Sequence, residues 1–235
     1  MRGYGWLVMV LVAMATQVAA ADSLFTGAEV MPSDAIVLFD GKDLSGWVQA
    51  GSDKPAGWKV GSGYAEVNGT GSIMTKREFA DYQLHVEFWL PLMADASGQA
   101  RANSGVYMHG RYEVQVLDSY GLKSQSNDCG GIYGVGAALV NACRPPEQWQ
   151  SYDIVFHAPT LDAQGKKLTN ARMTVLQNGV LIQDNVEVPG PTTAAISSDD
   201  RAVGPVMLQD HGCPVRYRNI WLRALPALTG TVGKG

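Results

Sequence analysis

Residues Asn103 to Gly121, NSGVYMHGRYEVQVLDSYG, place a carboxylate, a carboxamide and aromatic rings at the spacing of β-strands. If residues 109–111 form a turn, Tyr107 pairs with Glu113 and Gly105 with Gln115, so Tyr107, Glu113 and Gln115 share one strand face. The opposite face is then apolar and comprises Val106, Met108, Tyr112, Val114 and Val116. A solvated outer face is the ordinary explanation for polar strand residues. Because Asp118 follows at once in a glycine-rich and asparagine-rich loop, we instead expect a site here.

Other polar side chains on strand-like segments could meet on the same concave face. They are Glu87, His157, Gln209, His211 and Arg218, with His109 and Asp118 joining from loop ends. Paired carboxylates can hydrolyse glycosides, and a histidine near neutral pKa can take a proton from carbon. Each residue also has a purely structural interpretation, such as an exposed strand position for Glu87 or a solvated sheet edge for Arg218.

The elements that must position these residues are short strands. The segment 79–90 alternates apolar and polar residues with period two, and 149–157 does the same. Asn178-Gly179 between 171–177 and 180–183 is a strong hairpin signal. Further strands are expected at 35–39, 58–60, 64–67, 73–75, 203–209 and 215–225. Ten to thirteen strands without an amphipathic helix predict an all-β fold, two antiparallel sheets packed as a sandwich or jelly roll.

The first 21 residues have the pattern of a secretory signal peptide. Arg2 precedes an apolar stretch, and Ala19-Ala20-Ala21 provides small residues for cleavage before Asp22. We therefore expect a secreted or periplasmic protein with no stable membrane insertion after cleavage. A lead-in segment (22–34), a single domain (35–225) and a flexible tail (226–235) complete the predicted organisation. The net charge of −4 and the lack of basic runs argue against nucleic acid as a partner.

Three cysteines follow the signal segment. Export permits disulfides, and Cys129 and Cys143 bracket a loop rich in glycine and asparagine. We predict a disulfide between these two, with Cys213 unpaired. The three cysteines lack metal-site spacing, and no phosphate loop, nucleophile elbow or calcium loop is present.

Several blocks of sequence resemble the 3-keto-disaccharide hydrolase domain family. They are FDGKDLSGW (39–47), the 103–121 block, DCGGIYG (128–134), WQSYDIVFHAP (149–159) and GPVMLQDHGCPVRYRNIWLRAL (204–225), and they occur in the expected order. The resemblance implies a concanavalin-like jelly roll. It also implies an enzyme that cleaves glycosides already oxidised at C3 of the sugar.

The resemblance also implies roles for individual residues. A 3-ketone acidifies the C2 hydrogen, so a modest base can remove it and the enediolate then expels the group on C1. His211 or Glu113 is expected as the base, Arg218 and Gln115 as holders of the oxyanion or hydroxyls, and Asp118 as a catalytic or loop-orienting residue. From their expected place on the concave face, Tyr107, Glu87, His109, His157 and Gln209 are expected to bind the carbohydrate. By the resemblance, His109 stands where many relatives carry arginine.

A divalent cation held by Glu113 and a histidine is a further possibility that the resemblance raises. Two other functions compete with the enzyme: a non-catalytic glycan-binding jelly roll and a laminarinase-like endo-glucanase. The glucanase needs a dense acidic strand motif, whereas this strand reads E-V-Q-V-L-D, with a glutamine at its centre.

Overall fold

The computed structural model describes residues 31–226. The predicted signal peptide, most of the lead-in segment and nearly all of the tail lie outside the described residues. The described part contains fifteen β-strands and one short 3-10 turn, η2 (Gly98–Ala100), which confirms the all-β prediction. Among these residues no helix is long and apolar enough to cross a membrane.

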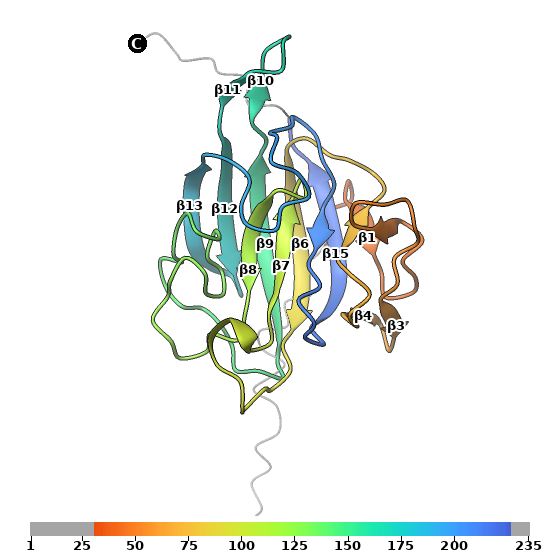
Figure 1. Cartoon of the computed structure of the whole chain (residues 1–235), viewed down its shortest axis with the longest axis vertical. Coiled ribbons are helices and arrows are strands. Elements are labelled where there is room, and N and C mark those ends of the chain that lie inside the picture. Colours follow the sequence, from red (N-terminus) through yellow and green to blue (C-terminus); the bar gives the residue numbers. More distant parts are fainter. Residues whose placement is uncertain (1–30, 227–235) are drawn as a thin grey trace, which may run out of the picture. The chain divides into compact units, whose positions relative to one another are not determined.

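The strands form two main antiparallel sheets and one separate hairpin (Figure 1). The larger sheet has the order β13 (Val180–Val188), β12 (Ala171–Gln177), β9 (Trp149–His157), β6 (Tyr82–Trp89), β15 (Arg216–Ala224), β4 (Tyr64–Glu66) and β3 (Lys59–Gly61), and β1 (Ile36–Phe39) also pairs with β15. The smaller sheet has the order β2 (Trp47–Gln49), β5 (Ile73–Thr75), β14 (Met207–Leu208), β7 (Ser104–Met108) and β8 (Tyr112–Val116). The separate hairpin is β10 (Thr160–Leu161) with β11 (Lys167–Thr169).

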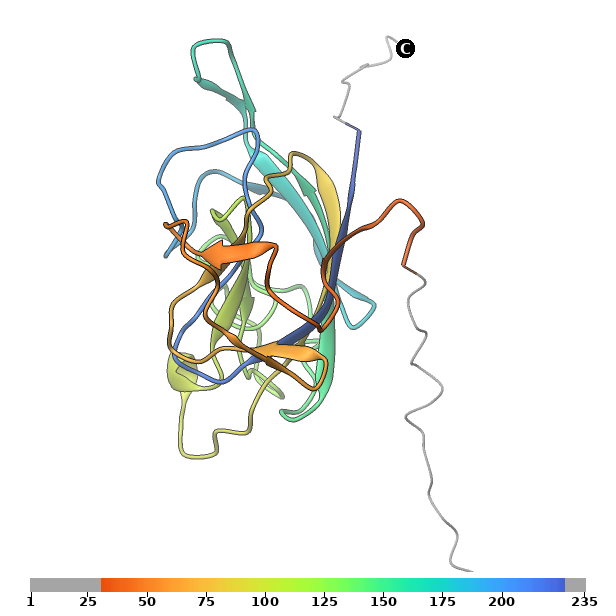
Figure 2. The ribbon, with the colours of Figure 1, turned by 90° about the vertical axis from the view of Figure 1, so that its right-hand side faces the viewer.

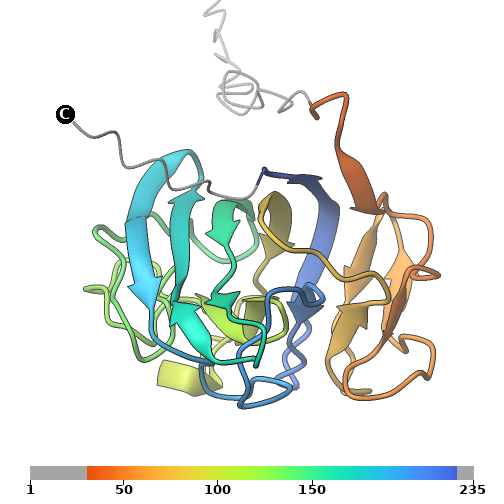
Figure 3. The same ribbon diagram turned by 90° about the horizontal axis from the view of Figure 1, so that it is seen from above.

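The two sheets pack face to face around one apolar core, as the side view in Figure 2 and the view from above in Figure 3 show. Strand alternation explains the packing: Tyr82, Leu84, Val86 and Phe88 of β6 are fully buried in the core. The intervening residues of β6 lie on the outer face of the larger sheet. Each strand of the sandwich thus has a core side and an outer side, and functional residues must come from the outer sides or the loops.

The sequence patterns located most strands correctly. Strands β5, β9 and β12 have the expected limits, and the Asn178-Gly179 turn joins β12 to β13, with both residues at positive φ. Strand β14 is only two residues long, although 203–209 was expected to be extended throughout. The long segment 117–148 contains turns and isolated bridges but no named strand.

The predicted disulfide is wrong, because all three cysteines are free thiols. Cys129 and Cys143 are buried neighbours whose side chains contact each other as thiols. Cys129 Sγ lies 3.1 Å from the Tyr152 hydroxyl and accepts a hydrogen bond of 3.3 Å from Gln177 Nε2. The thiols therefore act as small polar members of the core rather than as a covalent link across the loop.

Candidate active site

The hairpin of β7 and β8 has the register that the sequence predicted. Tyr107 faces Glu113, and Gly105 faces Gln115. Met108 faces Tyr112, and His109 and Gly110 in the turn both have positive φ. The aliphatic face joins the core, so Tyr107, Glu113 and Gln115 lie together on the outer face of the smaller sheet.

Gly105 creates the space in which the Glu113 carboxyl lies. A Cβ atom at position 105 would collide with Glu113 Oε1 and with the Tyr107 ring. Because Gly105 has no side chain, the carboxyl can lie across the strand close to the backbone. The glycine is thus a structural requirement for the position of Glu113 and not only a flexible link.

A hollow of about 140 Å³ opens over this hairpin. It is lined by five residues that the sequence analysis selected and five that it did not. The selected residues are Tyr107, Glu113, Gln115, Gln209 and His211; the others are Gln99, Asn103, Tyr133, Thr193 and Ala194. The missed residues come from loops and from the 3-10 turn η2. Two of them, Asn103 and Tyr133, lie in sequence blocks that the family resemblance singled out (103–121 and 128–134). The volume suits part of a ligand, such as one sugar ring, because sites for whole drug-sized molecules are larger, roughly 300 to 1,000 Å³.

Glu113 is the only carboxylic acid among the residues that line this hollow, and its pKa is strongly raised. Only 2% of the residue is exposed, and burial raises the pKa of Glu113 to about 8, although a hydrogen bond with Tyr107 acts in the opposite direction. At neutral pH the Glu113 carboxyl is therefore mostly protonated. Once it loses its proton, it is a much stronger base than an ordinary carboxylate.

Tyr107 connects Glu113 to two other walls of the hollow. Its hydroxyl donates to the Thr193 carbonyl over 2.9 Å and accepts from Gln209 Nε2 over 3.1 Å. The single phenolic proton is thus used, and a protonated Glu113 can donate to the remaining lone pair. Burial and the adjacent carboxylate raise the pKa of Tyr107, so the phenol stays neutral. Burial, and not the hydrogen bond with Tyr107, is thus the cause of the raised pKa of Glu113.

His211 and Tyr133 line the same hollow with free polar atoms. Neither the His211 ring nor the Tyr133 hydroxyl makes a side-chain hydrogen bond to another described residue. His211 is exposed, and Tyr133 is partly exposed. Both side chains are therefore available to form hydrogen bonds with a bound ligand.

Asp118 is not a wall of the hollow. Its side chain is completely buried, forms an ion pair with Arg101 and accepts a hydrogen bond from the Tyr120 backbone. These contacts hold the start of the loop that follows β8. The structure thus fits the loop-orienting role that the sequence analysis offered for Asp118.

His109 is buried in the turn between β7 and β8, away from the hollow. Its ring nitrogens lie 3.2 Å from the Arg201 carbonyl and 3.0 Å from the Ala80 carbonyl, and the ring packs edge-on against Phe156. Burial lowers the pKa of His109, while the two carbonyl contacts act in the opposite direction. The residue fastens the turn to the segment 200–204 and has no access to a ligand in the hollow.

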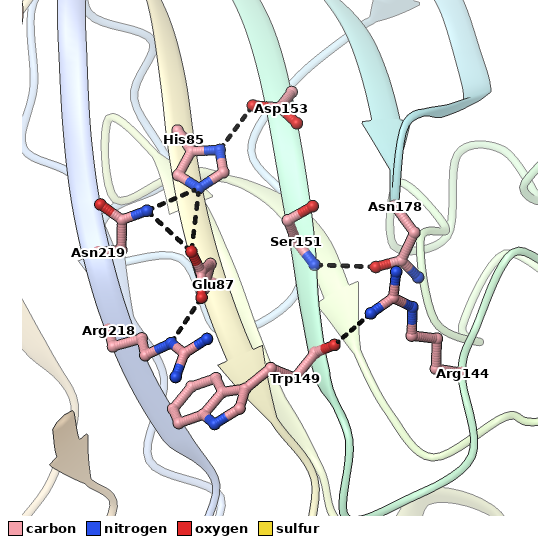
Figure 4. A network of polar contacts seen from close by, with 9 residues as sticks. All are labelled: His85, Glu87, Arg144, Trp149, Ser151, Asp153, Asn178, Arg218 and Asn219. Atoms are coloured by element: carbon pink, nitrogen blue, oxygen red, sulfur yellow. Dashed lines mark hydrogen bonds and ion pairs between the residues drawn. The ribbon is translucent and has the colours of Figure 1, made fainter. Parts of the chain in front are cut away.

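The expectation that Glu87 and Arg218 share the hollow with Glu113 is wrong. Both lie on the outer face of the larger sheet, where Arg218 Nε donates to Glu87 over 2.6 Å and the guanidinium stacks on Trp149 at 4.0 Å (Figure 4). Burial alone would raise the pKa of Glu87, but hydrogen bonds from His85, Asn219 and Arg218 hold this pKa at about 2. Strand alternation identified these residues as outward-facing. It could not show that they belong to the other sheet.

His157 is likewise separate from the hairpin site. It pairs with Asp81 over 3.0 Å and lines a larger hollow, about 790 Å³, beside the β10–β11 hairpin. The charged groups in that larger hollow neutralise one another, as in the Arg172–Glu187 pair and in Lys167, which binds Asp200. We therefore place the candidate active site in the smaller hollow, where an unpaired histidine and a perturbed carboxyl lie together.

The residues of the smaller hollow do not fit a resident metal ion. Glu113 and His211 are its only carboxylate and imidazole, and no group of three or more His, Cys, Asp or Glu able to hold a metal occurs among residues 31–226. We therefore assign the chemistry to the side chains themselves.

Comparison with known proteins places this geometry in a family. The family described as 3-keto-alpha-glucoside-1,2-lyase-like domain matches residues 34–223. A crystal structure from Parabacteroides distasonis ATCC 8503, of a protein provisionally named a glycosyl hydrolase, is 42% identical, covers 83% of this chain and 85% of its own, and superposes with a TM-score of 0.76.

Two further proteins of the same organism, with the same provisional name, share the fold. One is 19% identical with a TM-score of 0.61, over 82% of this chain and 94% of its own. The other is 22% identical with a TM-score of 0.56, over 81% and 99%. A search of curated proteins found no match. The match over residues 34–223, together with the identity to the first structure, shows that this chain belongs to the 3-keto-α-glucoside-1,2-lyase-like domain family.

Proposed function

We propose that this protein is a carbohydrate-active enzyme that cleaves the glycosidic bond of 3-keto-glycosides by removing the C2 proton. The observation that carries the proposal is the Glu113 carboxyl, which is buried beside an unpaired histidine and has a pKa raised to about 8. A base of this strength suits a carbon acid next to a ketone. The family name and the provisional names of the related structures support carbohydrate chemistry of the lyase or hydrolase type.

In the proposed reaction Glu113, once ionised, takes the proton from C2 of the oxidised ring. The electron pair of the C–H bond forms the enediolate of the C3 ketone, and its collapse to a C1–C2 double bond breaks the bond from C1 to the aglycone oxygen. His211 in its protonated form donates a proton to that departing oxygen. Water then adds at C1 of the new double bond and gives one proton to the now neutral His211, while Glu113 returns its proton to C2. The net result is hydrolysis, and both side chains regain their starting forms.

The hollow argues against the endo-glucanase alternative. Ordinary glycosidases use two carboxyl groups about 5 to 9.5 Å apart across the scissile bond. Glu113 is the only acidic residue that lines the hollow, because Asp118 is buried against Arg101 and Glu87 lies on the other sheet. One carboxyl with a raised pKa fits proton removal from carbon better than displacement at C1.

The test is to compare aglycone release from a 3-keto-glucoside and from the same glucoside without oxidation. We expect turnover only of the keto sugar, and the Glu113→Gln variant should lose at least about 10²-fold in kcat because a general base is removed. The matched control is Glu87→Gln, which removes a carboxylate from the outer face of the larger sheet and should retain turnover. Equal turnover of both glucosides, or sugar binding without turnover, would overturn the proposal and favour a glucanase or a binding module.

Export is a second proposal, and it rests on the N-terminal sequence alone. We infer that the segment before Asp22 is removed during secretion. The mass of the protein recovered from the periplasm or medium should correspond to a chain that begins near Ala21 or Asp22. Recovery of the full-length chain from the cytoplasm would contradict this.

A further inference from the structure

Three side-chain amides form a fixed cluster at one wall of the hollow. Gln99 Oε1 accepts hydrogen bonds from Asn103 Nδ2 over 3.2 Å and from Gln115 Nε2 over 3.0 Å. Asn103 Nδ2 also donates to the Gln99 carbonyl, and Gln115 Nε2 to the Asn127 carbonyl. Because carbonyl oxygens can only accept, these contacts fix which end of each amide carries the nitrogen.

The oxygen ends of the Asn103 and Gln115 amides are unpaired. Asn103 Oδ1 and Gln115 Oε1 are buried and have no hydrogen-bond partner among the described residues. Only 2% of Asn103 and 1% of Gln115 is exposed, and both residues line the hollow beside Glu113. Leaving a buried acceptor unpaired is unfavourable, so both oxygens call for a hydrogen-bond donor.

We propose that Asn103 and Gln115 bind two hydroxyl groups of the sugar ring whose C2 proton Glu113 removes. This inference rests on the proposed function and adds a specificity to it: the ring must carry free hydroxyl donors where it meets the amide wall. A ketone has no proton to donate, so the C3 oxygen of the substrate must lie away from these two residues. Tyr133, which also lines the hollow, has a free hydroxyl that can donate to that oxygen.

The orientation of the ring follows from this arrangement. The aglycone occupies C1 next to the reacting C2, and the ketone occupies C3. The hydroxyls that remain on the ring are those on C2, C4 and C6. The amide wall therefore selects an unsubstituted sugar with at least two of these groups free, and a ring substituted there with methyl groups or further sugars is excluded.

The experiment measures binding rather than turnover, so that it is separate from the test of the reaction. Glu113→Gln protein is titrated by calorimetry with methyl 3-keto-glucoside and with its single-deoxy analogues at C2, C4 and C6. The same series is run with the unoxidised methyl glucosides. Two of the three deoxy sugars should bind roughly 10- to 100-fold more weakly than the parent sugar.

Variants then assign each hydroxyl to its amide. In Gln115→Met or Asn103→Leu, the preference for the parent sugar over one particular deoxy analogue should fall to near one. A purely structural role would weaken binding of both sugars equally and leave their ratio unchanged. The matched control is Gln177→Met: Gln177 Oε1 is also buried and unpaired, but the residue lies on β12 outside the hollow, so the ratio should not change.

The outcomes separate this inference from the proposed reaction. If the protein with Asn103 and Gln115 intact binds all deoxy sugars as tightly as the parent sugar, the proposed specificity is refuted, even when 3-keto-glucosides are turned over. If the discrimination is present but no keto sugar is cleaved, the reaction is refuted and the hydroxyl site stands. Discrimination that disappears when a chelator removes divalent cations would show that the two oxygens hold a cation instead, which also overturns the inference.

Discussion

Replacing Glu113 with glutamine should make the protein more stable at alkaline pH while abolishing its turnover. The pKa of Glu113 is about 8 in the folded protein and near 4.5 in an unfolded chain. Below pH 4.5 both states are protonated, so the carboxyl has no effect on the free energy of unfolding. Between 4.5 and 8 only the unfolded state ionises, and the folded protein loses stability as pH rises; above 8 the loss is complete.

The size of this effect follows from the pKa difference. Each pH unit in which only the unfolded state is ionised lowers the free energy of unfolding by about 1.4 kcal/mol. From pH 5 to 8.5 the wild-type protein should therefore lose about 4 kcal/mol through Glu113. Glutamine does not ionise, so the variant does not lose stability in this way. Its free energy of unfolding relative to wild type should therefore rise by about 4 kcal/mol over the same range.

Urea denaturation at pH 5, 6, 7 and 8.5, on wild type and variant, measures this difference. Glu87→Gln is the control, because Glu87 has a pKa near 2 in the folded protein and is ionised in both states over most of the range. Its replacement should lower stability by an amount that is nearly independent of pH. A Glu113→Gln effect that is equally flat would show that Glu113 is ionised in the folded protein, and the proposed base would lose its physical basis.

Four further predictions follow from the same contacts. For a 3-keto-glucoside whose aglycone leaves as a stable anion such as nitrophenolate, and so needs no proton from His211, kcat/KM should rise with pH with a midpoint near 8; a profile that is flat from pH 6 to 9 would exclude Glu113 as the base. Gly105→Ala should lower kcat by about 10²-fold because the new Cβ displaces the Glu113 carboxyl, whereas Gly46→Ala, which meets no atom within 4 Å, should retain full activity. Arg218→Met should retain turnover within about twofold and cost about 1 kcal/mol of stability, since its half-exposed pair with Glu87 lies on the other sheet; a large loss of kcat would place Arg218 in the reaction after all. A thiol reagent should modify no cysteine in the native protein and all three in denaturant without reductant. Modification of only one cysteine in denaturant would show that the predicted disulfide between Cys129 and Cys143 is present after all.

The hairpin register was predictable because its information is local. Period-two alternation fixes which residues share a face, and the turn residues His109 and Gly110, which adopt positive φ, fix which strand positions are opposite. The pairing of Tyr107 with Glu113 follows from these two facts alone. The family blocks then supplied the fold, and the structural comparisons agree with it.

The rest of the site depends on contacts between distant segments, which a local pattern does not record. Alternation showed that Arg218 points away from the core, but only the pairing of β15 with β6 shows which sheet it belongs to. Tyr133 and Thr193 approach Glu113 from loops that carry no periodic signal. The thiols of Cys129 and Cys143 lie together, as their places at the ends of one loop suggested, yet the hydrogen-bond partners of Cys129 on β9 and β12 could not be read from spacing.

The cost of ionising Glu113 is also the source of its strength as a base. The same burial that removes about 4 kcal/mol of stability at alkaline pH raises the affinity of the carboxylate for a proton by the equivalent factor, roughly 10³-fold. A mutation that lets water or a cation reach Glu113 should therefore stabilise the fold and weaken the base together. Gly105 and Tyr107, which hold the carboxyl in its buried position, are the positions where this exchange of stability for reactivity should be strongest.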